Sequence, residues 1–184
     1  QRQMCIRDRE LIDRFNHGEL MHADSIHFPD SLKYQTKKLA RTVYGGGGIM
    51  PDFFVPIDTT QYTDYHRNIV AKSVVIKTTM KFIESHRKEL QSKYKKFETF
   101  NDKFEISDEI LANMQTLAEQ EKIKFDEKQY RKSLPLIKTQ LKALIARDLW
   151  DMNEYFQIMN TTDSSVLQAL KVLNEGAYEK VVRL

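Results

Sequence analysis

The side chains that most often perform catalysis or bind metal ions are few in this sequence and poorly spaced for either task. His17, His22 and His27 recur at intervals of five residues. Ligands on one face of a helix lie three or four residues apart, and those on one face of a strand lie two apart. No Glu or Cys completes a set such as His-Glu-x-x-His. We therefore interpret these three as partly exposed loop residues and His66 and His86 as isolated helical residues, and expect no metal or cofactor site.

The glycine run at residues 45–48 invites comparison with a phosphate-binding loop. Such a loop continues into Lys-Ser or Lys-Thr and then into the start of a helix. Here the run continues as Ile-Met-Pro-Asp at residues 49–52 and then as a strand-like segment. A tight structural turn is the better interpretation, and a nucleotide-binding enzyme is the weakest of the functional alternatives.

No serine is placed for nucleophilic attack. None lies in a Gly-x-Ser-x-Gly elbow or in a glycine-rich turn whose N–H groups could form an oxyanion hole. Ser25, Ser31 and Ser107 suit turns or helix caps. The remaining candidates stand on expected helices beside lysines, which are frequent in this chain: Ser73, Ser85, Ser92 and Ser133.

Asp148 and Asp151 are the carboxylates that flank the large aromatic side chain of Trp150. Spaced three apart on one helix they would share a side, and pairing with Arg147 or Lys142 is the expected role. With the histidines and serines excluded, no self-sufficient active site is expected, and no catalytic residue is assigned.

The composition is that of an ordinary globular chain. Hydrophobic residues make up 41% and charged residues 30% of the 184 residues, a balance found in neither disordered nor membrane-embedded proteins. The net charge is only +3 and the basic residues alternate with acidic ones, which disfavours nucleic acid as a partner. No apolar run approaches the roughly 18 residues of a membrane span. Cys5 is the single cysteine, so no internal disulfide is expected.

Glycine and proline divide the chain into two parts. Five glycines and three prolines precede residue 57, whereas only Pro135 interrupts the chain from there to Gly176. A stretch free of such residues and rich in Lys, Glu, Gln and Leu is typical of helices. We set residues 1–9 aside as a non-native or disordered terminus, assign 10–58 to strands and turns, and assign 59–184 to a helical domain. The expected fold class is α+β, mostly α.

Three short strands are expected in the first part. Residues 32–36 alternate between apolar and polar side chains, and residues 41–44 and 52–55 are two further candidates. Three short strands make a sheet with little core of its own. They are therefore expected to be the edge of a larger sheet whose other strands are absent.

Apolar side chains recur at helical spacing through the second part. Ser107 and Asp126 are typical N-caps, and Gly176 is a typical helix stop. Pro135 is expected near a first turn or at a kink. The expected apolar faces are Ile76, Met80, Ile83, Leu90 and Tyr94; Ile110, Leu111, Met114, Leu117 and Ala118; Leu134, Ile137, Leu141, Leu144, Ile145, Leu149, Met152, Phe156 and Met159; and, over 164–174, Val166, Leu167, Leu170 and Leu173.

Several runs resemble the C-terminal end of bacterial C-terminal processing (tail-specific) proteases. Residues 41–58 resemble the end of the protease core, where a Gly-Ile-x-Pro-Asp element, here at residues 48–52, leads into a core strand. Residues 14–19 and 23–26 resemble an insertion found in one branch of that family. In the helical part, Arg-Lys-Glu-Leu at 87–90 and the run at 141–150 are also similar. Ala40 departs from the family pattern, which has glycine before the arginine.

The resemblance implies a function for a parent enzyme rather than for this segment. Such enzymes are serine endopeptidases with a Ser-Lys dyad, in which a lysine of lowered pKa acts as the base. A PDZ domain receives the C-terminus of the substrate by strand addition. In the family the dyad and the PDZ domain both precede the part that is similar here. The segment alone is expected to be inactive, and the implied location is the bacterial cell envelope or periplasm.

Two functional classes therefore remain from the sequence. The first is a non-catalytic C-terminal portion of a serine protease, which completes the core sheet and supplies a helical scaffold or assembly surface for the upstream core. The second is a free-standing helical module that binds protein partners. Orphan strands before the helices favour the first class, because an adaptor has no need of them.

Overall fold

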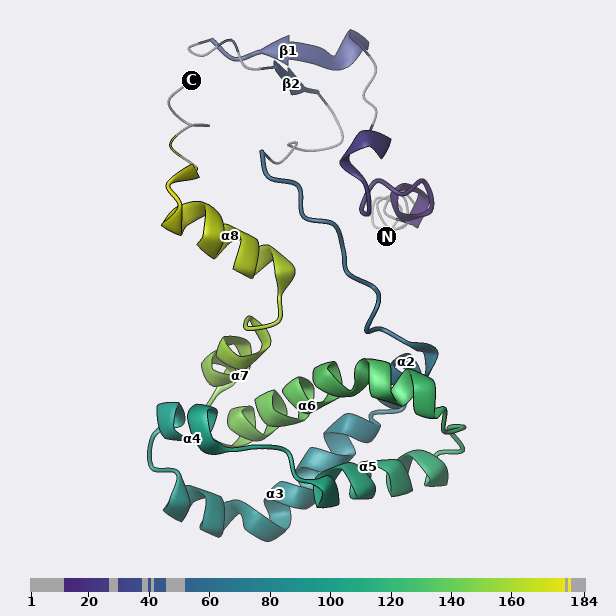
Figure 1. Ribbon diagram of the computed structural model, residues 1–184, viewed down its shortest axis with the longest axis vertical. Coiled ribbons are helices and arrows are strands. Elements are labelled where there is room, and N and C mark those ends of the chain that lie inside the picture. Colours follow the sequence, from purple (N-terminus) through teal and green to yellow (C-terminus); the bar gives the residue numbers. More distant parts are fainter. Residues whose placement is uncertain are drawn as a thin grey trace, which may run out of the picture. The chain divides into compact units, whose positions relative to one another are not determined.

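The computed structural model describes residues 12–26, 30–37, 40, 42–45, 52–177 and 179. The fold is α+β and mostly α, with one small antiparallel sheet among these residues (Figure 1). Residues 1–9, set aside from the sequence, lie outside the described residues. The elements in chain order are the 3-10 turns η1 (Ala23–Ser25) and η2 (Asp30–Leu32), strands β1 (Lys33–Gln35) and β2 (Thr42–Tyr44), and helices α2 (Asp64–Ala71), α3 (Val74–Lys93), α4 (Phe97–Lys103), α5 (Asp108–Gln120), α6 (Glu127–Leu149), α7 (Met152–Met159) and α8 (Ser164–Asn174).

The chain divides into two compact units. The first unit comprises residues 1–58 together with 168–184, and the second comprises residues 59–167. Helix α8 therefore begins in the second unit and contributes its last residues to the first. None of the described helices is both long enough and apolar enough to cross a membrane.

The first unit contains the two-stranded sheet. β1 and β2 pair antiparallel, with Tyr34 opposite Val43, which confirms two of the three expected strands. Gly45 follows β2 and donates its N–H to the Leu32 carbonyl oxygen at 2.8 Å. A Cβ atom at this position would lie 2.8 Å from Cε2 of Tyr34, so a residue without a side chain fits there.

The prediction of a third strand at residues 52–55 is wrong. These residues form a bend followed by irregular chain, and only β1 and β2 pair among the described residues. A strand needs a neighbour to complete its hydrogen bonds, and apolar alternation alone does not provide one. The glycine turn at residues 46–48 lies outside the described residues.

The described residues of the first unit form almost no core. Val172 is the single buried side chain among its described residues. Its exposed large apolar side chains are Ile12, Phe15, Tyr34, Val43, Phe53, Ile57, Leu170 and Leu173. Burial of apolar surface is the main stabilising contribution to a fold, and this unit obtains little of it alone.

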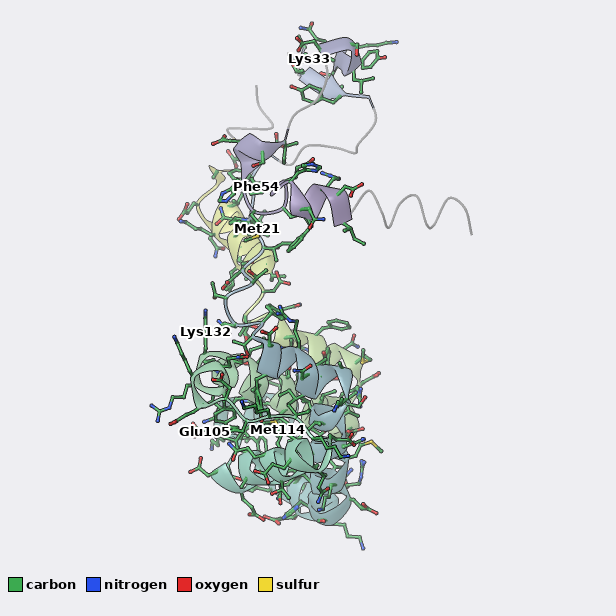
Figure 2. The ribbon with its side chains drawn as sticks, turned by 90° about the vertical axis from the view of Figure 1, so that its right-hand side faces the viewer. Met21, Lys33, Phe54, Glu105, Met114 and Lys132 are labelled. Atoms are coloured by element: carbon green, nitrogen blue, oxygen red, sulfur yellow. The ribbon has the colours of Figure 1, made fainter. Side chains whose placement is uncertain are left out.

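The second unit is built around α6. Ile137, Leu141 and Ile145 lie on one side of this helix, and each is 0% exposed. Helices α2, α3 and α7 pack against α6, and α5 packs against α3. Figure 2 shows Met114 of α5 inside this unit and Lys132 of α6 projecting at its margin. The expected N-caps Ser107 and Asp126 are confirmed, since their side chains accept hydrogen bonds from the N–H groups of Ile110 and Gln129.

Helix α3 buries only part of the face that its apolar pattern predicts: Leu90 and Tyr94 are buried, whereas Ile76 is exposed. Ile83 is 3% exposed, as expected, but Met80 is 59% exposed. Thr78 and Thr79 are buried instead, because each hydroxyl donates to a carbonyl oxygen in the preceding turn of the helix, at 2.8 Å for the bond from Thr78 to Val74. Burying a threonine whose hydroxyl is bonded in this way costs little free energy. A prediction that considers only apolar residues therefore overlooks such a threonine.

The sequence also predicts one continuous helix from Leu134 to Met159, and this is wrong. α6 ends at Leu149 and α7 starts at Met152. Asp151 is the N-cap of α7, and Trp150 leaves the helical conformation with φ −126° and ψ −96°. Pro135 lies inside α6, two turns beyond its start rather than in the first turn.

The last helix agrees with the sequence. α8 spans Ser164–Asn174 as expected, and Gly176 adopts φ +63° beyond its end. The Gly176 N–H donates to the Leu173 carbonyl oxygen at 3.2 Å, which closes the helix.

The two apolar residues of α3 provide a matched test of this packing. Ile83→Ala should lower the free energy of unfolding by about 2–5 kcal/mol, because it opens a cavity in the core. Met80→Ala should change it by less than about 0.5 kcal/mol, because the side chain is exposed. Urea unfolding followed by far-ultraviolet circular dichroism measures both. Equal losses in the two variants would show that Met80 is buried.

Candidate functional site

In the part of the chain that the structure describes, the histidines do not come together as a metal-binding set. His17 and His22 are both exposed, and His27 lies outside the described residues. Among the described residues, no group of three or more His, Cys, Asp or Glu side chains is placed to hold a metal ion. His66 and His86 stand on α2 and α3 respectively.

A buried polar cluster joins the start of α2 to α6. The Ser133 hydroxyl is fully buried and donates to the Gln61 carbonyl oxygen at 2.6 Å. Its single proton is thereby used, so Thr63 Oγ1 donates to Ser133 Oγ across 2.7 Å. Thr63 is also the N-cap of α2, and its Oγ1 accepts from the His66 N–H at 3.3 Å. Gln129 Oε1 completes the cluster by accepting from the Tyr65 N–H at 2.8 Å.

His66 provides a second hydrogen bond between α2 and α6. The ring is 3% exposed, and Nε2 lies 2.9 Å from Gln140 Oε1. A carbonyl oxygen only accepts, so Nε2 carries the proton in this pair. The Nδ1 atom is buried without a hydrogen-bond partner among the described residues. This histidine packs edge-on against Tyr62, with 5.5 Å between ring centroids.

This cluster is suited to fixing helices, not to catalysis. Ser133 has no base beside it, because its partners are the backbone carbonyl oxygen of Gln61 and the hydroxyl of Thr63. The nearest analogue of a serine–histidine pair, Ser85 and His86, is also unproductive. Ser85 Oγ donates to the Lys81 carbonyl oxygen at 3.3 Å, and His86 Nδ1 donates to that of Phe82 at 3.0 Å. Both line a shallow depression of about 120 Å³ between α3 and α5, with Glu109 among the other lining residues.

Lys142 is the lysine whose pKa could suit a Ser-Lys dyad, but its ammonium group bonds to a backbone carbonyl oxygen and not to a serine. Burial lowers the pKa of Lys142, which is the direction that a lysine base requires. Its Nζ, however, donates to the Asn101 carbonyl oxygen at 2.6 Å and lies 6.0 Å from the centre of the Phe100 ring. No serine hydroxyl of the described residues is hydrogen bonded to it.

The expected relation between Asp148 and Asp151 is wrong, because the helix ends between them. Asp148 lies in the last turn of α6, whereas the Asp151 side chain accepts from the Met152 N–H at 2.6 Å and caps α7. Arg147 approaches Asp148 at 3.8 Å, as expected, but Lys142 bonds elsewhere. Trp150 packs against the rings of Phe97 and Phe100, with centroids 5.9 and 5.3 Å away.

The residues of the polar cluster were missed by sequence reasoning because their partners are distant in the chain. Ser133 and Gln61 are 72 residues apart. One signal was available: Ser133 stands four residues before Ile137, in line with Leu141 and Ile145 on the buried side of α6. A hydroxyl on that side must be hydrogen bonded. This requirement predicts that Ser133 bonds to another segment of the chain and holds it against α6.

Residues 65–151 match the model of a family described as a family of unknown function (DUF8443). The matched stretch begins in α2 and ends at Asp151, the cap of α7. It includes Ser133 and Gln129 of the polar cluster, whereas Gln61 and Thr63 lie before it. No curated protein matches the chain. No solved structure matches it either.

Removal of the Ser133 hydroxyl tests whether its hydrogen bonds hold the start of α2 against α6. Ser133→Ala should lower the free energy of unfolding by about 1–3 kcal/mol, because the buried Gln61 carbonyl oxygen and Thr63 hydroxyl lose their partner. Ser92→Ala on exposed α3 surface is the matched control and should stay within about 0.5 kcal/mol. Urea unfolding measures both variants. A neutral Ser133→Ala would show that the cluster does not hold α2 on α6.

The buried Tyr65 hydroxyl gives a pH-dependent test of the same helix. Burial raises the pKa of Tyr65 from 10.0 to about 12, and its Oη has no hydrogen-bond partner among the described residues. The folded state therefore favours the neutral phenol. Its contribution to stability is complete below pH 10 and is lost as the pH rises toward about 12. Tyr65→Phe should remove this part of the pH dependence, whereas Tyr62→Phe, at a 46% exposed side chain, should retain it. Thermal unfolding between pH 9 and 12 measures the stability of wild type and both variants. Identical dependence of stability on pH in wild type and Tyr65→Phe would contradict the prediction.

Proposed function

We propose that this chain is the non-catalytic C-terminal portion of a bacterial serine endopeptidase that acts on proteins from their C-termini. The first unit contributes strands to the protease core. The second unit supplies a helical scaffold or interaction surface. Catalysis and substrate capture belong to an upstream Ser-Lys core and PDZ domain, which are the partners of this segment.

The observation that carries the proposal is the missing core of the first unit. Val172 is the only buried side chain among its described residues, while Tyr34 and Val43 on the two paired strands are 59% and 41% exposed. Two strands alone are at best marginally stable. Their open edges can pair with further strands, as the edge of a truncated sheet would.

The sequence resemblance identifies which larger sheet this would be. The runs at 14–19, 23–26 and 41–58 are similar to the end of the core of C-terminal processing proteases, and those at 87–90 and 141–150 to its helical tail. By the same resemblance, we place the parent in the cell envelope or periplasm. Ser85, Ser133 and Lys142 each donate to a backbone carbonyl oxygen.

A free-standing helical interaction module is the second candidate. The observation in its favour is that the second unit has its own core and fastens its own helices, with Ile137, Leu141 and Ile145 fully buried. A free-standing helical module does not require the strands of the first unit. We therefore prefer the proposal that the chain is a segment of a protease.

Hydrogen exchange of the strands separates the two candidates. The backbone amides of Tyr34 and Val43 should exchange rapidly in this chain and slowly in a longer chain that extends through the upstream reading frame. Burying one large apolar side chain contributes about 1.5–3 kcal/mol, whereas ordering each residue's backbone costs about 1–2 kcal/mol. The few apolar side chains of this segment cannot offset its ordering without a partner surface.

The amide of Ile145 in α6 is the internal control and should be equally protected in both chains. Strong, equal protection of the two strand amides in both chains would favour the free-standing module. An upstream reading frame without a serine and lysine in the family context would also overturn the protease assignment.

A further inference from the structure

The solvent-facing side of α6 carries basic residues and no acidic one. Successive helical residues are turned by about 100°, so seven positions between 128 and 142 fall within about one third of the circumference of α6. Each of the seven side chains is exposed or half-buried. We call these residues the lysine face: Lys128, Arg131, Lys132, Pro135, Lys138, Thr139 and Lys142. Figure 2 shows Lys132 of this face projecting at the margin of the helical unit.

Most of the positive charge on the lysine face is not neutralised by a neighbouring side chain. Arg131 pairs with Glu127 at 2.5 Å, and the Lys142 Nζ donates to the Asn101 carbonyl oxygen. The other lysines of the face form no ion pair with a described residue: Lys128, Lys132 and Lys138. These three are spread over about 15 Å of the helix axis, at 1.5 Å for each residue.

The segment around the lysine face is the most basic part of the chain's charge pattern. Residues 122–142 include seven basic and two acidic residues, an excess larger than the net charge of +3 of the whole chain. Both acids are engaged, Asp126 as the N-cap of α6 and Glu127 in its ion pair. An apolar side chain stands beside the first lysines, because Phe125 is 43% exposed although its ring packs edge-on against Tyr65.

The side chains present indicate which anionic partner fits. Sites for single-stranded nucleic acid add aromatic side chains on which bases stack, and sites that read duplex DNA add Arg, Asn or Gln that reach base edges. The lysine face has no aromatic residue, and its single arginine is already paired. A bilayer of anionic lipids needs neither, because its charge is spread over a surface that attracts clusters of lysines on a helix. A neighbouring apolar side chain such as Phe125 can then enter the headgroup region.

We propose that the lysine face of α6 is a docking surface for a membrane of anionic phospholipids. The three unpaired lysines supply the attraction, and Phe125 supplies an apolar contact at one end of the face. The surface lies wholly within the second unit, so the proposal stands on that unit alone. It goes beyond the proposed function, because it assigns the helical unit a partner that is not a protein.

Co-sedimentation of the full chain with lipid vesicles tests the proposal. Vesicles of equal parts phosphatidylcholine and phosphatidylglycerol should retain the chain at about 0.15 M salt and release it at about 1 M, because the Debye length falls from about 8 to about 3 Å. Vesicles of phosphatidylcholine alone should retain little. Each lysine at an anionic surface strengthens binding by roughly five-fold, so replacing all three unpaired lysines with Gln should weaken it on the order of 100-fold.

Two further triple variants keep the test specific. Replacing the same three lysines with Arg preserves the charge and should preserve binding. Lys81→Gln with Lys88→Gln and Lys95→Gln removes the same charge from exposed positions on α3 and just after it, and should bind as wild type. Gln, Arg and Lys have similar helix propensities, so circular dichroism should show unchanged helix content in all three variants.

Three results would overturn the proposal. An equal loss of binding in the α3 control would show that overall charge, and not the lysine face, holds the chain on vesicles. Retention by neutral vesicles, or none by anionic ones, would show that an anionic bilayer is not the partner. Tighter retention of a duplex DNA fragment than of anionic vesicles, lost when the α6 lysines become Gln, would show that the face binds nucleic acid instead.

Discussion

Burial of one side of α6 is the constraint on which the helical unit depends. Ile137, Leu141 and Ile145 exclude water completely, and α2, α3 and α7 each pack against this helix. Because that side is apolar, the one hydroxyl on it must find partners inside the protein. Ser133 finds them in the Gln61 carbonyl oxygen and the Thr63 hydroxyl. The apolar burial thus brings α2 to α6, and the hydrogen bonds determine where along α6 the start of α2 lies.

The two units obtain their stability in opposite ways. The second unit buries its own apolar side chains and bonds several of its polar side chains internally, including threonines of α3 that bond to the preceding turn. The described part of the first unit has local order and a single buried side chain: two short strands pair in register, and Gly45 lies close to Tyr34. Backbone pairing of this extent fixes local geometry, but it provides little free energy against the loss of conformational freedom.

Local rules predicted the features that depend on neighbouring residues. The bounds of α8, the caps at Ser107 and Asp126, and the stop at Gly176 each follow from a few adjacent side chains. The misses have equally specific causes. The helix break at Trp150 was hidden because the apolar spacing continues across it, while the cap that creates it is one aspartate. The exposed position of Met80 and the partners of Ser133 depend on helices that meet only in three dimensions. Local spacing places Ser133 on the buried side of α6 but does not identify the groups that it bonds to.

The break after α6 also determines how the protein can be observed. Trp150 is the only tryptophan in the chain, and it is held in contact with Phe97 and Phe100 of α4. Its indole emission therefore reports on the environment where the end of α6 meets α4, inside the helical unit. The other unit contains no tryptophan at all. Intrinsic fluorescence excited at the red edge of absorption will follow the melting of one half of this chain and be blind to the other, so a single sharp transition in that signal says nothing about whether the strands were ever folded.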